Sequence, residues 1–212
     1  MMIKFRKQEL KDIIISIAFI SILFSVHMYY NFKFTLNDFI IVIPIALIVF
    51  ALSLFAKIYT HKLTALKFKY TVTYNKWGYG LIFSLLTFIF SVMILTPGYM
   101  DYGAYARMAD SKEKGIISLS GNITNIILSI IFLLLVLILK EFSIIFSNDA
   151  YGVLLLVSIM AFKINSFIAF FNLIPFYMLD GINVINWNRK VWIVSILISA
   201  LLSYLAMSNI LL

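Results

Sequence analysis

Long apolar segments, separated by short polar ones, set the pattern of this chain. The apolar segments cover residues 13–30, 39–56, 81–95, 116–139, 151–171 and 191–212. Most of them approach the ~20 residues that a helix needs to cross a bilayer. Helices are expected there because the bilayer core offers no water to satisfy open backbone groups. The pattern therefore predicts an all-α polytopic integral membrane protein.

The third apolar segment differs from the others at both of its ends. It follows Trp77-Gly78-Tyr79-Gly80 and stops at Thr96-Pro97-Gly98, and such Gly and Pro clusters mark turns. The preceding residues 68–74 alternate between apolar and polar side chains, which is typical of a β-strand. Segment 81–95 can therefore either cross the membrane once or dip into it and return.

The positions of the basic residues decide between these two topologies. Residues 1–11 are basic, which places the N-terminus in the cytoplasm by the positive-inside rule. With a single crossing, the basic loop around Arg107 and the basic pair at 189–190 would lie outside. With a dipping segment, the only basic loop residues outside are Lys33 and Lys140. We therefore predict five full spans plus a re-entrant or doubled-back segment.

The composition restricts the possible classes of function. Hydrophobic residues make up 63% of the 212 residues and charged residues only 12%, far from the values of a soluble domain. The chain has no Cys, so a thiolate metal site is impossible. The net charge of +8 lies in residues that flank apolar spans, which indicates contact with a lipid bilayer and no nucleic acid. We expect a single membrane domain over residues 1–212.

Four residues after the fifth segment have a distinctive spacing. Asn172, Pro175, Asp180 and Gly181 read N-x-x-P-x-x-x-x-D-G. Pro175 interrupts a helix, and broken helices at membrane depth are tolerated where they line a cavity, so Asp180 is a candidate site residue. The alternative is an ordinary helix end with a Pro and an Asp-Gly turn. From these residues alone, the ordinary helix end is the favoured interpretation.

This spacing resembles the second active-site motif of the site-2 protease family, the zinc metalloproteases that cleave substrates within membranes. The resemblance implies that Asp180 stands at a zinc-ligand position. Residues 120–125, Ser-Gly-Asn-Ile-Thr-Asn, are similar to the family's A-G-P-x-x-N helix and keep Gly121 and Asn125. The resemblance is strongest to an archaeal-type branch, with a core over about 39–192 and flanking spans at 13–30 and 191–212.

The family's other motif, H-E-x-x-H, is altered in this chain. His61 aligns with the second histidine, whereas Lys57 stands at the first and Ile58 at the catalytic glutamate. A catalytic zinc needs about three protein ligands, and only His61 and Asp180 remain. Losing the general base alone costs a factor of about 100 to 10,000 in rate. The family uses zinc, but we expect none here and predict a pseudoprotease.

Lys57 has two interpretations. Its ammonium group can take the place of the metal charge and pair with Asp180, with His61 as a third member, since buried acids need such a partner. Alternatively, Lys57 lies at a helix end and extends to the lipid headgroups, which is the more common arrangement. A separation well beyond about 6 Å between Lys57 and Asp180 would exclude the pair.

Lys163 is the one charge inside a predicted span, and such a charge costs on the order of 3 kcal/mol at the helix centre. It should face protein or a water-filled cavity, either with a function or packed against carbonyl groups without one. Three functions follow from these observations. The first is a pseudoprotease that holds a transmembrane helix of a partner near the cytoplasmic side. The others are an active metalloprotease with unusual ligands and a small transporter.

Overall fold

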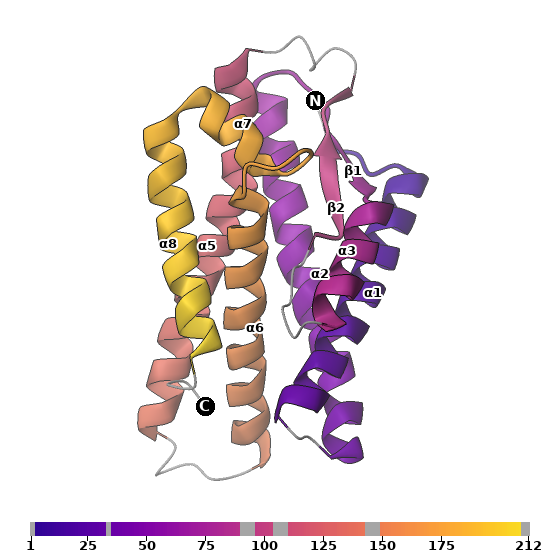
Figure 1. Cartoon of the computed structure of the whole chain (residues 1–212), viewed down its shortest axis with the longest axis vertical. Helices are drawn as coiled ribbons and strands as arrows, with labels where there is room; N and C mark the ends of the chain where they lie inside the picture. The colour runs from indigo at the N-terminus through magenta and orange to yellow at the C-terminus, as the bar shows by residue number, and fades with distance from the viewer. Residues whose placement is uncertain (1–2, 33–34, 90–95, 104–109, 143–148, 209–212) are drawn as a thin grey trace.

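The computed structural model describes residues 3–32, 35–89, 96–103, 110–142 and 149–208. Within them, five helices are long and apolar enough to cross a membrane. They are α1 (Lys7–Phe32), α2 (Leu36–Lys67), α5 (Ser111–Phe142), α6 (Asp149–Leu173) and α8 (Arg189–Met207). They run along the long axis of the molecule (Figure 1). The prediction of a polytopic α-helical membrane protein with five spans is therefore confirmed.

Helix α2 extends well past the predicted end of its apolar segment at residue 56. It begins at a capping box in which Thr35 and Asp38 each accept a hydrogen bond from the other's backbone N–H, and it continues to Lys67. Residues 57–67 include charged side chains, yet Lys57, His61 and Lys62 are buried. The helix continues because these polar side chains find partners inside the protein instead of reaching the headgroups.

A short hairpin fixes the path of the third apolar segment. Strands β1 (Thr73–Lys76) and β2 (Gly98–Asp101) are antiparallel, and Lys76 pairs with Gly98. Helix α3 (Gly78–Ile89) lies between them, and residues 90–95 are outside the described part. Because the chain leaves and returns at paired residues, the segment doubles back, as predicted. The alternative of a single crossing is wrong.

The strand begins later than the alternation at 68–74 predicted. Lys69 takes a left-handed conformation with φ of 64°, and the N–H groups of Phe68 and Tyr70 both donate to the Ala65 carbonyl. These bonds close the last turn of α2 in the way left-handed residues commonly end helices. The chain becomes a strand only at Thr73, because the end of α2 uses the preceding residues.

Helix α1 is joined to the hairpin by a row of polar side chains. Glu9 accepts from the Tyr74 N–H at 2.8 Å and pairs with Lys62 at 2.8 Å. The Lys62 ammonium also donates to the Val72 carbonyl. About two helical turns after Glu9 on α1, Ser16 accepts a hydrogen bond from the Tyr74 hydroxyl at 2.9 Å. These bonds connect α1, α2 and β1 at one end of the molecule.

We expect Glu9→Gln to destabilise the protein by about 3 kcal/mol, because it leaves the Lys62 ammonium buried without a countercharge. Glu9 and Lys62 are 2% and 5% exposed. Thermal unfolding in detergent measures the effect. The exposed Glu141 on α5 provides the control, since Glu141→Gln should change stability by less than about 0.5 kcal/mol. Equal stability of the two variants would show that the pair contributes nothing.

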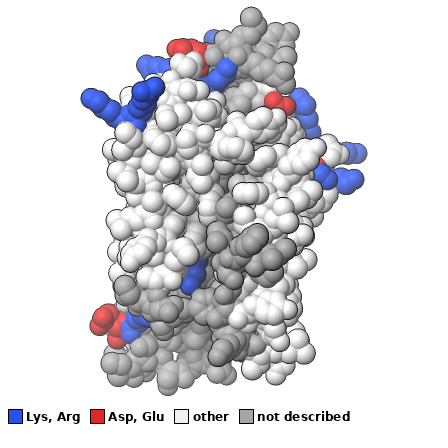
Figure 2. All heavy atoms as spheres, in the orientation of Figure 1, with Lys and Arg blue, Asp and Glu red and all other residues white. Residues whose placement is uncertain are grey.

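The apolar core forms on both sides of α6. One cluster joins α6 to α1 and α2 through residues such as Ile20, Phe50 and Ile164. A second joins α6 to α5 and α8 through residues such as Phe162 and Leu202. On the face shown in Figure 2, the surface along the helices is mostly uncharged, and most of the charged side chains lie near the two ends. This distribution suits contact with a lipid bilayer.

Candidate functional site

One face of α2 carries the side chains that the sequence singled out. Lys57 and His61 are four residues apart and so lie on the same side of the helix. They are 6% and 0% exposed. Ile58 is buried as well and packs in an apolar cluster with Ile13 and Ile117. Ile58, which stands where the resembled family has its catalytic glutamate, therefore packs against apolar side chains.

Asp180 reaches this face because the chain breaks after α6. Helix α6 ends at Leu173, Pro175 follows in the connection, and Asp180 opens the short helix α7 (Asp180–Trp187). A Cβ at Gly181 would collide with the Leu173 carbonyl, so the glycine allows α7 to sit against the end of α6. The start of a helix also favours a carboxylate. The helix break predicted at Pro175 thus directs Asp180 toward the interior.

Lys57, His61 and Asp180 meet in the interior. The Lys57 ammonium lies 2.9 Å from Asp180 Oδ2, and His61 Nε2 lies 3.5 Å from the same oxygen. The ion pair, the less common of the two arrangements considered for Lys57, is therefore present. The alternative, a lysine that extends to the headgroups from a helix end, is wrong, because α2 continues beyond Lys57 and buries it.

A residue that the sequence interpretation did not select completes the site. Asn122 on α5 donates its amide to Asp180 Oδ2 at 3.0 Å and to the Ser118 carbonyl at 2.8 Å. It stands where the resembled A-G-P-x-x-N motif has proline, a residue without a side-chain donor. That departure from the motif, one residue after Gly121, was the signal available in the sequence. The third polar group around the Asp180 carboxylate thus comes from α5.

The surroundings keep Asp180 ionised. Burial raises the pKa of its carboxyl, but the Lys57 ammonium and the His61 imidazole outweigh this effect and hold the pKa well below its usual range. Burial and the nearby Asp180 charge raise the pKa of Tyr102, so its hydroxyl stays neutral. This hydroxyl shares a hydrogen bond with Ser118, which also accepts from Asn183. A layer of neutral hydroxyl and amide groups therefore adjoins the ion pair.

Gly121 lets α5 pack directly against the site. A Cβ at this position would collide with the His61 imidazole and would press on the Lys57 side chain. We expect Gly121→Ala to destabilise the protein by about 2–3 kcal/mol, because overpacking forces both side chains to shift. Gly152 on α6 has open space around it, so Gly152→Ala should be neutral or slightly stabilising. Comparing the two unfolding temperatures checks the prediction, and equal effects would contradict it.

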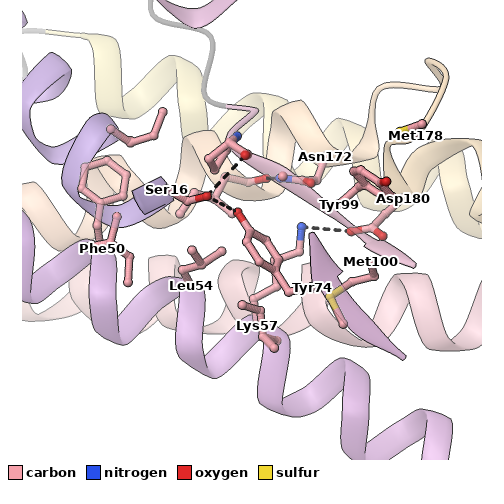
Figure 3. Close-up of a pocket in the computed structure, with 16 residues that line it drawn as sticks. Ser16, Phe50, Leu54, Lys57, Tyr74, Tyr99, Met100, Asn172, Met178 and Asp180 are labelled. Atoms are coloured by element: carbon pink, nitrogen blue, oxygen red, sulfur yellow. Dashed lines mark hydrogen bonds and ion pairs between the residues drawn. The ribbon is translucent and has the colours of Figure 1, made fainter. Parts of the chain in front are cut away.

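A small cavity adjoins the ion pair. Its volume is about 30 Å³, enough for about one water molecule. Lys57, Asp180 and Asn172 point toward it from three elements, and Tyr99 and Met100 of β2 border it (Figure 3). The hairpin and the break after α6 therefore close over the pair and leave no room for a peptide in this conformation.

The donors at this site do not match those of a catalytic zinc. His61 and Asp180 are suitable ligands, but the third neighbour is a lysine ammonium, which has no lone pair to offer. Among the described residues no three His, Cys, Asp or Glu side chains gather in one place. The residues outside the described part contain none of these four types. The chain thus supplies two of the roughly three protein ligands that catalytic zinc sites use.

The remaining candidate residues have structural partners. Asn125 on α5 donates to Asn165 on α6 at 2.8 Å, a hydrogen bond between helices. Asn172 donates to the Ile168 carbonyl of its own helix and borders the cavity. Lys163 is only 5% exposed, so it faces protein as expected. It lies about 13 Å along α6 from Asn172, by the helix rise, and does not line this cavity.

An apolar groove lies beside the site. It has a volume of about 440 Å³ and is lined by Trp77, Tyr79 and Phe83 near α3 and by Phe171, Ile174, Phe176 and Leu179 around the end of α6. Asn172, which borders the cavity of the ion pair, lies between two of these residues in sequence. The groove therefore brings an apolar surface close to the buried pair.

The fold and this site define an α-helical polytopic membrane protein whose buried polar centre joins α2, α5 and α7. Over 194 residues, the chain is 30% identical to "Putative zinc metalloprotease MJ0611" of Methanocaldococcus jannaschii, and the match covers 89% of each chain. The chain belongs to the metalloprotease-like family of this protein. No family model matches the chain, and no solved structure matches it.

Proposed function

We propose that this protein is a site-2-protease-like pseudoprotease that binds a transmembrane helix of a partner without cleaving it. The observation that carries the proposal is the Lys57 ammonium, 2.9 Å from Asp180. In the resembled family, the first zinc-ligating histidine would stand at position 57. An ammonium there supplies positive charge to the carboxylate, and it supplies no metal ligand and no activated water.

The surroundings of Ile58 support the loss of hydrolysis. Its side chain is 1% exposed and packs among apolar residues, and an isoleucine has no group that can act as a general base. The chemistry left to the site consists of an ion pair and neutral amide and hydroxyl groups. These groups hold α2, α5 and α7 together, and they do not activate water.

The groove beside the site supports the binding role. Apart from Thr96, its lining is aromatic and aliphatic, and Phe176 in this lining is 60% exposed. An exposed apolar surface in a membrane protein suits either lipid or another apolar helix. The proposal places the partner helix here, with the site and the N-terminus on the cytoplasmic side, as the basic residues favour.

Crosslinking in native membranes tests the proposal. A photoreactive amino acid at Phe176 should capture one membrane protein as an intact adduct. The same probe at Tyr204, an aromatic residue of α8 that is 69% exposed, should capture only scattered neighbours. A cleaved product at Phe176 would support an active protease instead, and identical patterns at both positions would contradict the binding role.

A further inference from the structure

A basic cleft lies where the N-terminal residues meet the end of α2, and the site near Asp180 does not involve it. Its volume is about 500 Å³. One wall comes from Ile3, Lys4 and Arg6, before α1, and the other from Leu66 near the end of α2 and residues 70–73, which lead into β1. Among the residues that the structure describes, the cleft is lined by basic, hydroxyl and apolar side chains and by no acidic one.

The two walls are held in place by a buried lysine. The Lys62 ammonium donates to the Lys4 carbonyl at 3.1 Å and to the Val72 carbonyl at 2.9 Å, one from each wall. Glu9 neutralises this ammonium at 2.8 Å, and the Phe5 ring packs 4.8 Å from it. The cleft is therefore built before any ligand arrives, which reduces the entropy cost of binding.

The positive charge left for a ligand belongs to Lys4 and Arg6. Both side chains are exposed at the cleft, and within the described residues neither forms an ion pair. Thr71 and Thr73 add hydroxyl groups to the lining. Tyr70 also lines the cleft. Its hydroxyl donates to Glu113 at 2.7 Å and is therefore already engaged. Lysine, arginine and hydroxyl groups together match a phosphate.

The position of the cleft indicates which phosphate is available. Helix α1 begins at Lys7 and α2 ends at Lys67, so the cleft lies at the ends of two membrane-spanning helices. Lipid headgroups occupy this level of a bilayer. Ile3, Leu66 and Val72 also line the cleft and offer apolar contact beside the charged groups. We propose that this cleft binds the phosphate group of an anionic lipid headgroup.

Native mass spectrometry of the full-length protein in uncharged detergent tests the site. The probes are dioleoyl phosphatidylglycerol and uncharged dioleoyl phosphatidylcholine, added in equal amounts. The wild-type protein should retain phosphatidylglycerol preferentially. In Lys4→Gln/Arg6→Gln, this retention should fall roughly tenfold, because each basic residue near the surface contributes to anionic lipid binding. Both side chains are exposed, so the variant should unfold at the wild-type temperature.

A matched control variant separates a specific site from general attraction. Arg189 and Lys190 are exposed at the start of α8, at the same end of the molecule (Figure 1). Arg189→Gln/Lys190→Gln removes the same two charges and should retain phosphatidylglycerol as the wild type does. Equal losses in both variants, or no loss in either, would overturn the proposal. Displacement of the lipid by excess inorganic phosphate would assign the cleft to free phosphate and overturn the lipid assignment.

Discussion

Asp180→Asn should destabilise the protein by about 3–5 kcal/mol, the usual cost of removing one partner of a buried ion pair. The substitution keeps the shape of the side chain and an acceptor for Asn122, but it leaves the Lys57 ammonium buried without a countercharge. The two side chains are 2.9 Å apart and 7% exposed. Thermal or denaturant unfolding in detergent measures the loss.

The double variant Lys57→Met/Asp180→Asn provides the control for this prediction. It removes both charges, so it should recover most of the lost stability, because replacing a buried ion pair with uncharged groups is often close to neutral. Lys57→Met alone should be destabilising, since it leaves the Asp180 carboxylate buried. Additive effects of the two single substitutions would show that the charges do not interact, and would refute the central pair of the site.

Lys57→His/Ile58→Glu should convert the site into one that retains zinc. The change gives a third ligand beside His61 and Asp180 and restores the glutamate of the resembled motif. We expect about one zinc per chain in the variant, against almost none in the wild-type protein, by elemental analysis after dialysis. Zinc should also raise the unfolding temperature of the variant only, because a bound metal stabilises the folded state.

Adding His61→Ala to this variant removes one ligand and should abolish zinc retention, which controls for metal bound elsewhere. Stoichiometric zinc in the wild-type protein would overturn the proposed loss of catalysis and favour an active metalloprotease with unusual ligands. A folded variant that retains no zinc would show that the cavity between α2 and α7 cannot adopt a metal-binding geometry.

Much of the fold followed from the sequence because its determinants are local. Five apolar segments were long enough to span a bilayer, and the basic loops favoured the doubling back of segment 81–95. The spans follow from the thickness of a membrane, which is a fixed quantity. The ion pair was among the alternatives for another reason, because the family resemblance placed Lys57 and Asp180 at two zinc-ligand positions. Helix periodicity added only that Lys57 and His61 lie on one helix face.

The features that escaped prediction depend on contacts between distant segments. Helix α2 extends to Lys67 because Lys62 finds Glu9 and the Val72 carbonyl. Asn122 joins the site because α5 crosses α2 at Gly121. Composition and spacing identify neither Glu9 as the partner of Lys62 nor Asn122 as a partner of Asp180. A charged residue beyond an apolar segment reads as a headgroup anchor until its buried partner is known.

The bonds between α1 and the hairpin limit how the interior can become accessible. Glu9 and Ser16 both hold Tyr74 on β1, and β2, paired with β1, borders the small cavity at Lys57 through Tyr99 and Met100. An outward tilt of α1 would therefore either break these bonds or move the hairpin with it. If the hairpin moves with α1, the same displacement would open a path from the bilayer for a partner helix and expose the Lys57–Asp180 pair.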